Sequence, residues 1–176
     1  MNIQERIKST IRDIPDFPKA GILFKDITPI LTDAKLSQDI TRELANYWKK
    51  FDLDVIIGIE SRGFLWGSAL AQALSLPFVI ARKKGKLPAE TYEFKYDLEY
   101  GTAEIEIHKG AFVEGSKALI HDDLLATGGT ARAAAELVKL AGGEVAGFSF
   151  LVELSFLSGA KVLDEYKTPI HSLVTY

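Results

Sequence analysis

The sequence predicts an α/β domain with a mostly parallel central sheet flanked by helices. Short apolar runs alternate with amphipathic helical patterns along most of the chain, which is the order that a parallel sheet with crossover helices requires. The 176 residues fit one domain, and their 47% apolar share is enough to bury a core. No internal repeat or low-complexity linker divides the chain.

The first part of the chain is expected to contain two helices separated by an apolar loop. Isoleucine at every fourth position predicts an amphipathic helix over residues 3–13, and two prolines follow it. Residues 17–29 (FPKAGILFKDITP) are rich in proline and glycine but also apolar, as in loops that pack over a site. A second helix is predicted over residues 35–51.

The remaining elements follow the alternation of strand and helix. Residues 54–59 are a continuous apolar run that ends at a polar cluster, as expected of a buried parallel strand. Residues 102–109 alternate apolar and polar side chains, which predicts a strand with one wet face, and residues 92–97 are candidates for its hairpin partner. Further strands are predicted over residues 77–81, 117–121, 146–154 and 170–175, with helices over residues 63–75 and 128–141.

Composition and charge exclude several classes of function. The formal net charge is −3, so no broad basic surface is expected to bind nucleic acid or an anionic membrane. The absence of cysteine excludes disulfides, thiolate catalysis and cysteine-bound zinc, and the three histidines are too scattered for a histidine metal site. The charged N-terminus and the lack of an apolar window of about 18 residues predict a soluble, cytoplasmic protein.

The sharpest motif is residues 118–130, ALIHDDLLATGGT. A strand here delivers Asp122 and Asp123 to its carboxyl end, where ligands bind in open α/β sheets, and a glycine-rich loop then opens into a helix. The glycines let backbone N–H groups converge at the helix N-terminus, an arrangement suited to phosphate. Carboxylates beside a phosphate would repel it unless the same ligand offers hydroxyls or a nearby divalent metal, and a ribose 5-phosphate offers both.

Two alternatives to this interpretation are weaker. Other phosphate motifs do not fit, since the chain has neither the GxxxxGK[ST] loop nor the GxGxxG fingerprint. A plainer alternative is a strand-to-helix turn in which the aspartates and threonines only cap the helix. The whole string, in its strand–loop–helix context, favours the phosphate site.

The string HDDLLATGGT resembles the motif that binds phosphoribosyl pyrophosphate (PRPP) in type I phosphoribosyltransferases. Three further segments, FPKAGILFKDITP, IESRGFLWG and RKKGKLP with the later LEYG, resemble the adenine-specific branch of that family in order and spacing. The resemblance implies a type I phosphoribosyltransferase fold with a hood over about residues 1–34, a core over about residues 35–176, and a mobile hairpin loop. It also implies transfer of the 5-phosphoribosyl group from PRPP to adenine, which gives AMP and pyrophosphate in purine salvage.

The resemblance assigns roles to individual residues. Glu99 matches the carboxylate that faces N7 of adenine and exchanges a proton there, and Tyr100 follows it in the same loop. The remaining residues would bind the 5-phosphate (Ala126, Thr127, Gly128, Gly129, Thr130), the ribose hydroxyls (Asp122, Asp123), the pyrophosphate (Ser61, Arg62, Arg82, Lys83, Lys86) and adenine (Leu23, Phe24, Lys25).

Several of these residues also have a plainer interpretation. Arg62 could form a surface salt bridge, and the cations of residues 82–86 could belong to a solvated loop. Glu99 could be one exposed acid among several, and Phe24 could be a core residue. His121 departs from the family, which usually has an apolar residue before the acidic pair. We interpret it as a tolerated strand position with a satisfied imidazole rather than a catalytic group.

The resemblance further implies partners and leaves two rivals. Mg²⁺ should arrive bound to PRPP, without direct protein ligands, because it keeps its waters and prefers phosphate oxygens. A homodimer is implied, in which some of the cations serve the neighbouring subunit's site. The rivals are a transferase for a 6-oxopurine or a pyrimidine, which the hood sequence and LEYG oppose, and a PRPP-sensing regulator. Such regulators usually carry an added DNA-binding domain, for which this chain has no spare length and no basic helix.

Overall fold

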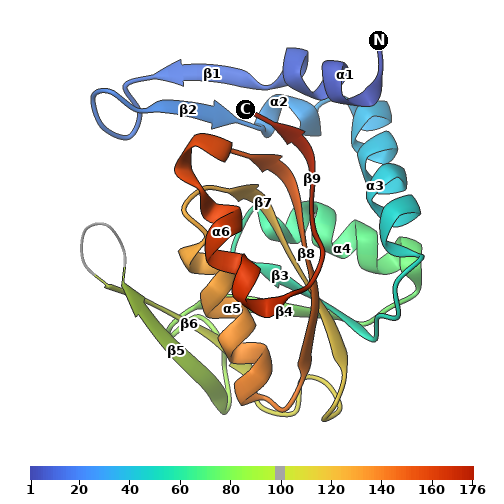
Figure 1. The fold of residues 1–176 in the computed structure, drawn as a ribbon, viewed down its shortest axis with the longest axis vertical. Helices are drawn as coiled ribbons and strands as arrows, with labels where there is room; N and C mark the ends of the chain where they lie inside the picture. Colours follow the sequence, from blue (N-terminus) through green and yellow to red (C-terminus); the bar gives the residue numbers. More distant parts are fainter. Residues whose placement is uncertain (98–101) are drawn as a thin grey trace.

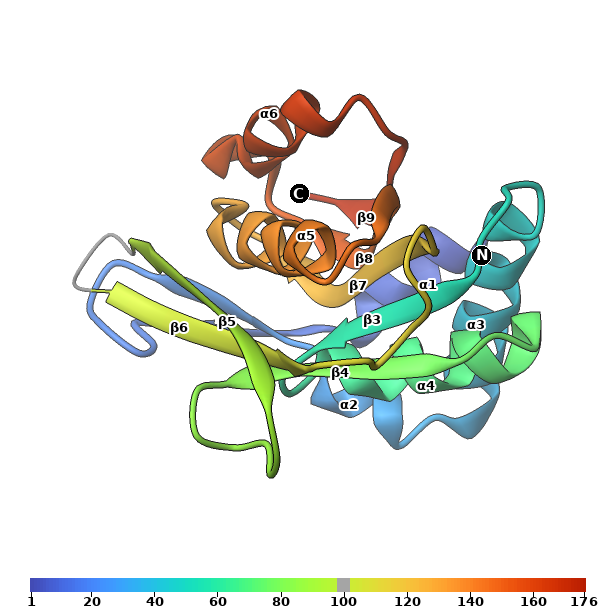
Figure 2. The same ribbon diagram turned by 90° about the horizontal axis from the view of Figure 1, so that it is seen from below.

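The computed structural model describes residues 1–97 and 102–176, which form three layers with a sheet in the middle (Figure 1, Figure 2). Helices α5 and α6 cover one face of the sheet, and α3 and α4 cover the other, which confirms the predicted α/β class. In this part of the chain, none of the helices reaches the length and apolar character of a membrane span. The helices and 3₁₀ turns are α1 (Ile3–Thr10), α2 (Thr28–Leu31), α3 (Ala34–Trp48), α4 (Gly63–Leu74), α5 (Gly129–Leu140), η1 (Ser155–Leu157), α6 (Gly159–Leu163) and η2 (Asp164–Tyr166).

Seven strands of the described chain form one sheet in the order β5-β6-β4-β3-β7-β8-β9. The strands from β4 to β9 in this order run parallel to their neighbours, whereas β6 is antiparallel to β4 and forms a hairpin with β5. The predicted hairpin partner at residues 92–97 is therefore confirmed. The strands are β3 (Val55–Ile59), β4 (Phe78–Lys83), β5 (Thr91–Asp97), β6 (Thr102–His108), β7 (Lys117–Leu125), β8 (Glu144–Glu153) and β9 (Ile170–Thr175).

The strand order reverses between β3 and β7, which places a switch point near the centre of the sheet. From β3 the chain steps to β4 on one side, whereas β7, β8 and β9 follow one another on the other side. Gly58 of β3 is in register with His121 of β7, so the carboxyl ends of these two parallel strands lie next to each other. Open α/β sheets bind their ligands in the crevice at such a point.

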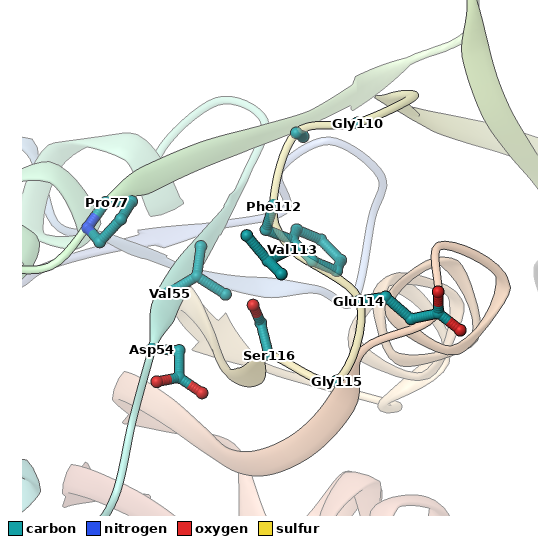
Figure 3. Close-up of a pocket in the computed structure, with 10 residues that line it drawn as sticks. Asp54, Val55, Pro77, Gly110, Phe112, Val113, Glu114, Gly115 and Ser116 are labelled. Carbon is teal, nitrogen blue, oxygen red and sulfur yellow. The ribbon is translucent and has the colours of Figure 1, made fainter.

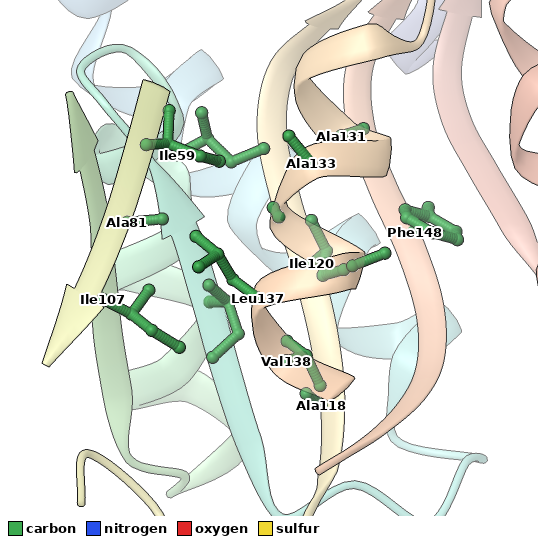
Figure 4. Close-up of a cluster of buried hydrophobic side chains, with 14 of the residues drawn as sticks. Ile59, Ala81, Ile107, Ala118, Ile120, Ala131, Ala133, Leu137, Val138 and Phe148 are labelled. Carbon is green, nitrogen blue, oxygen red and sulfur yellow. The ribbon is translucent and has the colours of Figure 1, made fainter. Parts of the chain in front are cut away.

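Two apolar cores hold the layers together, one on each face of the sheet. Alanines let α5 approach the sheet closely, and larger side chains such as Ile120 and Leu137 fill the space between them (Figure 4). On the opposite face, Trp48 of α3 and Trp66 of α4 are almost completely buried. The continuous apolar runs of β3 and β7 follow from this burial on both faces.

The N-terminal segment differs from its prediction. Helix α1 ends at Thr10, before its predicted end, and the expected irregular loop contains one strand of a two-stranded ribbon, β1 (Arg12–Pro15) with β2 (Leu23–Asp26). The buried carboxylate of Asp26 fixes this ribbon, because it accepts two hydrogen bonds from the Arg12 guanidinium at 2.6 and 3.1 Å. These contacts join residues on different strands, so helical spacing alone could not indicate them.

Two strands extend further than predicted at their carboxyl ends. Strand β4 continues to Lys83 and β7 to Leu125, whereas the sequence suggested ends at residues 81 and 121. We expected β7 to end where charged residues begin, yet Asp123 is only 3% exposed and the pairing with β8 continues beyond it. The acidic pair is therefore held rigidly by the sheet rather than by a loop.

Candidate active site

A hollow of about 170 Å³ lies where β3 and β7 come together, and side chains from both sides of the switch point line it. Ser61 and Arg62 enter it from the turn after β3, and Asp122 and Asp123 enter it from β7. Ser61, Arg62 and Lys83, predicted to bind pyrophosphate, therefore meet the acidic pair predicted to bind ribose in one place. The lining consists of Ile59, Glu60, Ser61, Arg62, Lys83, Tyr96, Ile105, Asp122, Asp123 and Thr130.

A smaller hollow of about 70 Å³ is formed by the glycine loop (residues 126–130), which joins β7 to α5. Gly128 is the N-cap of α5 and has a left-handed backbone with φ of 84°, which favours glycine. The first N–H groups of a 12-residue helix and its dipole make this loop suitable for an anion. Asp122 and Thr130 line both hollows, so the two hollows adjoin.

Close packing fixes the backbone of the glycine loop. A Cβ at Gly128 would lie 2.6 Å from the carbonyl oxygen of Gly159, and a Cβ at Gly159 would overlap the carbonyl oxygen of Ala126. Gly159 begins α6, so the N-terminus of that helix rests directly on the loop. Neither glycine leaves room for a side chain, and the loop has little freedom to change shape.

Asp123 is buried and Asp122 is partly buried, so the surroundings disfavour the charged form of both carboxyl groups. Burial and the neighbouring Asp123 charge raise the pKa of Asp122 well above its usual 3.8. Burial also raises the pKa of Asp123, although the Arg62 guanidinium opposes this shift. Asp122 Oδ1 accepts a hydrogen bond from the Asp123 N–H at 2.8 Å, and Asp123 Oδ2 lies 3.0 Å from Arg62 Nε. A ligand that donates hydroxyl hydrogen bonds would stabilise the ionised pair.

Arg62 connects the acidic pair with the N-terminal ribbon. While its Nε pairs with Asp123, its guanidinium carbon lies 5.3 Å from the centre of the Phe24 ring, within cation–π range. Phe24 belongs to β2, so this contact brings the ribbon to the edge of the larger hollow. A residue predicted to bind adenine and one predicted to bind pyrophosphate are thus neighbours.

The cations of residues 82–86 differ in their distance from the site, and only some of them line it. Lys83 lines the larger hollow, whereas Arg82 and Lys86 line neither hollow. Arg82 is held by Glu60 through contacts of 3.0 and 3.3 Å, and these hydrogen bonds lower the pKa of Glu60. The peptide bond between Glu60 and Ser61 is cis.

Tyr96 is a polar residue of the site that sequence reasoning did not identify. The hydroxyl of Tyr96 on β5 lies 3.3 Å from Oγ1 of Thr130, a hydrogen bond that joins the hairpin to the glycine loop. No short-range pattern marks this contact, because the two residues are 34 positions apart. Glu99 and Tyr100, predicted in the loop after this strand, lie outside the described residues.

The residues predicted to bind adenine lie together on β2 but face different ways. Phe24 contacts Arg62, and Leu23 is half exposed. Lys25 turns to the opposite side of the strand, where its Nζ lies 2.7 Å from Asp13 Oδ1 and 4.0 Å from the centre of the Tyr176 ring. Only the backbone of Lys25 is therefore available to a base at the site.

His121 is fully buried directly before the acidic pair. Its Nδ1 lies 3.1 Å from Ser149 Oγ, and within the described part of the chain its Nε2 has no hydrogen-bond partner. Burial lowers the pKa of His121 from 6.5 to about 3, so the ring is neutral at physiological pH. The predicted strand position is confirmed, whereas the expectation of a satisfied imidazole is met at only one of the two ring nitrogens.

Replacing His121 by valine is expected to weaken the dependence of stability on pH. The unfolded chain takes up a proton at His121 below about pH 6.5, whereas the folded chain does so only near pH 3, so this residue reduces stability as the pH falls between these values. At about pH 5 the reduction amounts to about 2 kcal/mol. Urea unfolding of the wild type and of His121→Val at about pH 7 and about pH 5 measures this difference. An equal loss of unfolding free energy between the two pH values in both proteins would contradict a neutral, buried His121.

A wider hollow of about 640 Å³ lies at the opposite end of the sheet, where β3 and β4 begin (Figure 3). Its walls come from the loop between β6 and β7, including Phe112 and Glu114, and from Asp54 and Pro77 just before the two strands. Its lining residues include no Lys or Arg and no helix N-terminus that would attract an anion. The carboxyl ends of β3 and β7 are therefore the stronger candidate site.

A switch-point crevice, a glycine loop at a helix N-terminus and an adjoining acidic pair are suited to a phosphorylated sugar. Residues 27–172 match the family described as the phosphoribosyl transferase domain, so fold and site define this chain as a phosphoribosyltransferase. An adenine phosphoribosyltransferase from Sorangium cellulosum is 53% identical over 173 residues, which cover 97% of this chain and 86% of that relative.

Solved structures give the same result. The crystal structure of adenine phosphoribosyltransferase from Thermoanaerobacter pseudethanolicus superposes with a TM-score of 0.94 at 52% identity, covering 98% of this chain and 99% of that one. The enzyme from Saccharomyces cerevisiae superposes with a TM-score of 0.90 at 39% identity, covering 98% of each chain. The chain belongs to the adenine phosphoribosyltransferase family, and the predicted type I phosphoribosyltransferase fold is confirmed.

Proposed function

We propose that this chain transfers the 5-phosphoribosyl group of PRPP to adenine, giving AMP and pyrophosphate. The observation that carries the proposal is the shared wall of the two hollows, where a glycine loop suited to phosphate adjoins a buried carboxylate, Asp123, and a partly buried one, Asp122, which need hydroxyl partners. A 5-phosphoribosyl group offers a phosphate and hydroxyls in one ligand. The relatives are adenine phosphoribosyltransferases by name, and the yeast enzyme was crystallised in a complex with adenine.

The sugar phosphate would be held at two points. N–H groups of the glycine loop and the hydroxyls of Thr127 and Thr130 would donate to the 5-phosphate. Asp122 and Asp123 would accept hydrogen bonds from the ribose hydroxyls. Because burial disfavours the ionised carboxylates, each hydrogen bond that they accept from the ribose strengthens binding.

The departing pyrophosphate would be stabilised by cations and by backbone groups at Ser61. Arg62 and Lys83 line the hollow of about 170 Å³ at the switch point, where positive charge can offset the charge that develops on the leaving oxygens. Arg82 and Lys86 would join them when the contact between Arg82 and Glu60 opens. This arrangement supports pyrophosphate as the leaving group.

Adenine would bind against the ring of Phe24, with backbone groups of Leu23 and Lys25 at the purine edge. A 6-amino group donates a hydrogen bond whereas a 6-oxo group accepts one, so a fixed backbone carbonyl at that edge favours adenine over hypoxanthine. As N9 attacks C1′ of the ribose, positive charge grows on the purine. The carboxylate of Glu99 would then take up a proton at N7, and Tyr100 would belong to the same covering loop.

Mg²⁺ would supply positive charge at the diphosphate and ribose oxygens when it is bound with PRPP. Two adjacent carboxylates line the hollow at the switch point, and one of them, Asp123, is already paired with Arg62. Both carboxylates are assigned to the ribose hydroxyls, so the ion would be held by oxygens of PRPP and its own waters rather than by a protein side chain.

The same proposal includes a single domain in which the hood, about residues 1–34, covers the core, about residues 35–176. The contact between Phe24 of the ribbon and Arg62 of the core supports this arrangement. We also propose a homodimer located in the cytoplasm, as the family resemblance implies.

The proposal is tested by supplying PRPP and Mg²⁺ with one base at a time and measuring pyrophosphate release. Adenine is expected to react at least about a hundredfold faster than hypoxanthine, because a mismatched hydrogen bond at the purine edge leaves polar groups unpaired. A preference for hypoxanthine or a pyrimidine would support the rival transferase. Binding of PRPP without pyrophosphate release from any base would support the regulator.

Replacing Glu99 by alanine is expected to lower turnover by about a hundredfold, because a positioned acid–base group commonly contributes that much. The affinity for PRPP should change far less, since Glu99 is assigned to the base. Glu90→Ala is the matched control, as Glu90 is an exposed acid paired only with Lys109 at 3.5 Å among the described contacts. Turnover at the wild-type level in Glu99→Ala would remove this residue from the mechanism.

A further inference from the structure

The ribbon that carries Phe24 to the site needs anchoring. In the described chain β1 and β2 form a sheet of their own, and an isolated two-stranded ribbon is only marginally stable. Ile27 and Ile30, which follow β2, are fully buried and fix one end. Toward the turn, Leu23 and Ile22 are 51% and 44% exposed, so little packing holds the other end. Lys25 lies at the boundary between the packed and the exposed part.

Lys25 is held by two groups at once. Its Nζ lies 2.7 Å from Oδ1 of Asp13, its register partner on β1, and 4.0 Å from the centre of the Tyr176 ring. The Lys25 side chain is only 10% exposed, so the ammonium is largely withdrawn from water. A cation over an aromatic face is attracted more strongly when it is desolvated in this way.

Tyr176 is itself fixed to the main sheet, beside the ribbon (Figure 1). It follows β9, and its N–H donates to the carbonyl oxygen of Glu153 at the end of β8, at 2.9 Å. Its carbonyl oxygen accepts hydrogen bonds from the N–H and the hydroxyl of Ser155, at 3.0 and 2.6 Å. The backbone that carries the ring contacted by Lys25 is therefore fixed to the main sheet.

Phe24 and Lys25 are adjacent on a strand, so their side chains point to opposite faces and the position of one determines the position of the other. We propose that Tyr176 is a positioning residue for the base. Its ring contacts the Lys25 ammonium on the face of β2 opposite to Phe24, and this contact fixes the Phe24 ring beside Arg62. This inference rests on the proposed function, since it takes Phe24 as the residue on which adenine stacks. It assigns a role in base binding to a residue with no contact to Phe24 among the described interactions.

Replacing Tyr176 by leucine is expected to raise the KM for adenine about fivefold, the effect of losing one largely desolvated cation–π contact. The KM for PRPP and kcat should stay within about twofold, because the glycine loop and the acidic pair are untouched. Tyr176→Phe keeps the aromatic face and is expected to behave as the wild type. Lys25→Met removes the cation but keeps the strand and should raise the KM for adenine as Tyr176→Leu does.

Lys8→Met is the matched control for these variants. Lys8 lies over the same ring, at 5.0 Å, and donates to the carbonyl oxygen of Thr175, but it belongs to α1 rather than to the ribbon. It should leave the KM for adenine unchanged. Thermal unfolding of each variant shows whether the fold is retained. If Tyr176→Leu does not fold, the KM for adenine of Lys25→Met tests the proposal in its place.

An unchanged KM for adenine in both Tyr176→Leu and Lys25→Met would overturn the proposal, as would an equal rise in Lys8→Met. A rise in the KM for PRPP equal to that for adenine would also overturn it, because the effect would then not be specific to the base. If the wild type itself does not turn over adenine, the proposed function fails. Amide hydrogen exchange across residues 23–26 then tests on its own whether the contact between Tyr176 and Lys25 anchors the ribbon. Faster exchange in Tyr176→Leu than in Tyr176→Phe supports the anchoring, and equal exchange overturns it.

Discussion

Replacing Gly159 by alanine is expected to weaken PRPP binding by on the order of a hundredfold, as if one or two hydrogen bonds to a charged phosphate oxygen were lost. The added Cβ would overlap the carbonyl oxygen of Ala126 and lie 3.0 Å from the backbone N of Gly128, so the glycine loop must move. Both contacts are with backbone atoms, which cannot rotate away as a side chain can. Gly159 itself is assigned no contact with the ligand.

Titration calorimetry with PRPP measures this effect, and Gly147→Ala is the matched control. A Cβ at Gly147 would lie 2.6 Å from ring atoms of Trp48 in the core, so this variant should lose stability through overpacking but bind PRPP normally. Wild-type affinity in Gly159→Ala would show that the shape of the glycine loop is not what binds the phosphate.

The double replacement of Asp122 and Asp123 by asparagine is expected to weaken PRPP binding by about a hundredfold or more. Each carboxylate that accepts a ribose hydroxyl contributes a charge-assisted hydrogen bond, and two such bonds together exceed this factor. Asp52→Asn, on an exposed side chain away from both hollows, is the control for loss of charge. Unchanged affinity in the double variant would show that the acidic pair does not touch the ribose.

The same double variant should keep its stability, or gain some, at neutral pH. A carboxyl whose pKa is raised by folding binds its proton more tightly in the folded chain, so its ionisation favours unfolding above that pKa. This cost is absent below the ordinary pKa of 3.8 and fully present above the raised value. Asparagine removes it. Thermal unfolding at neutral pH therefore separates lost binding from lost structure, since only the binding should suffer.

Periodicity and motif order were sufficient to predict the central layers of this fold. The apolar runs of β3 and β7 identified strands buried on both faces, and the alternation of β6 identified a strand with a hairpin partner. The glycine loop and the acidic pair could be found because they are contiguous in sequence. Local patterns of this kind are set by neighbouring residues, so they can be recognised without the fold.

Contacts between distant residues could not be predicted in the same way. The ribbon β1–β2 depends on the pair of Arg12 with buried Asp26, and Arg12 looks like the end of a helix when read alone. The cluster of cations was visible, but the pairing of Arg82 with Glu60 was not. Strand β7 was predicted too short because carboxylates usually mark a strand end, whereas tertiary burial overrides that tendency here.

The residues of the ribbon that are proposed to bind adenine lie on a different sheet from those proposed to hold PRPP. The small ribbon bears Phe24, whereas the acidic pair and the glycine loop are continuous with the large sheet. Exchange of the ribbon with that of a transferase for another base would thus be expected to alter acceptor choice without disturbing donor affinity. In such an architecture the surface on which the base stacks can change through substitutions within residues 12–26, while the loop that holds the phosphate stays the same.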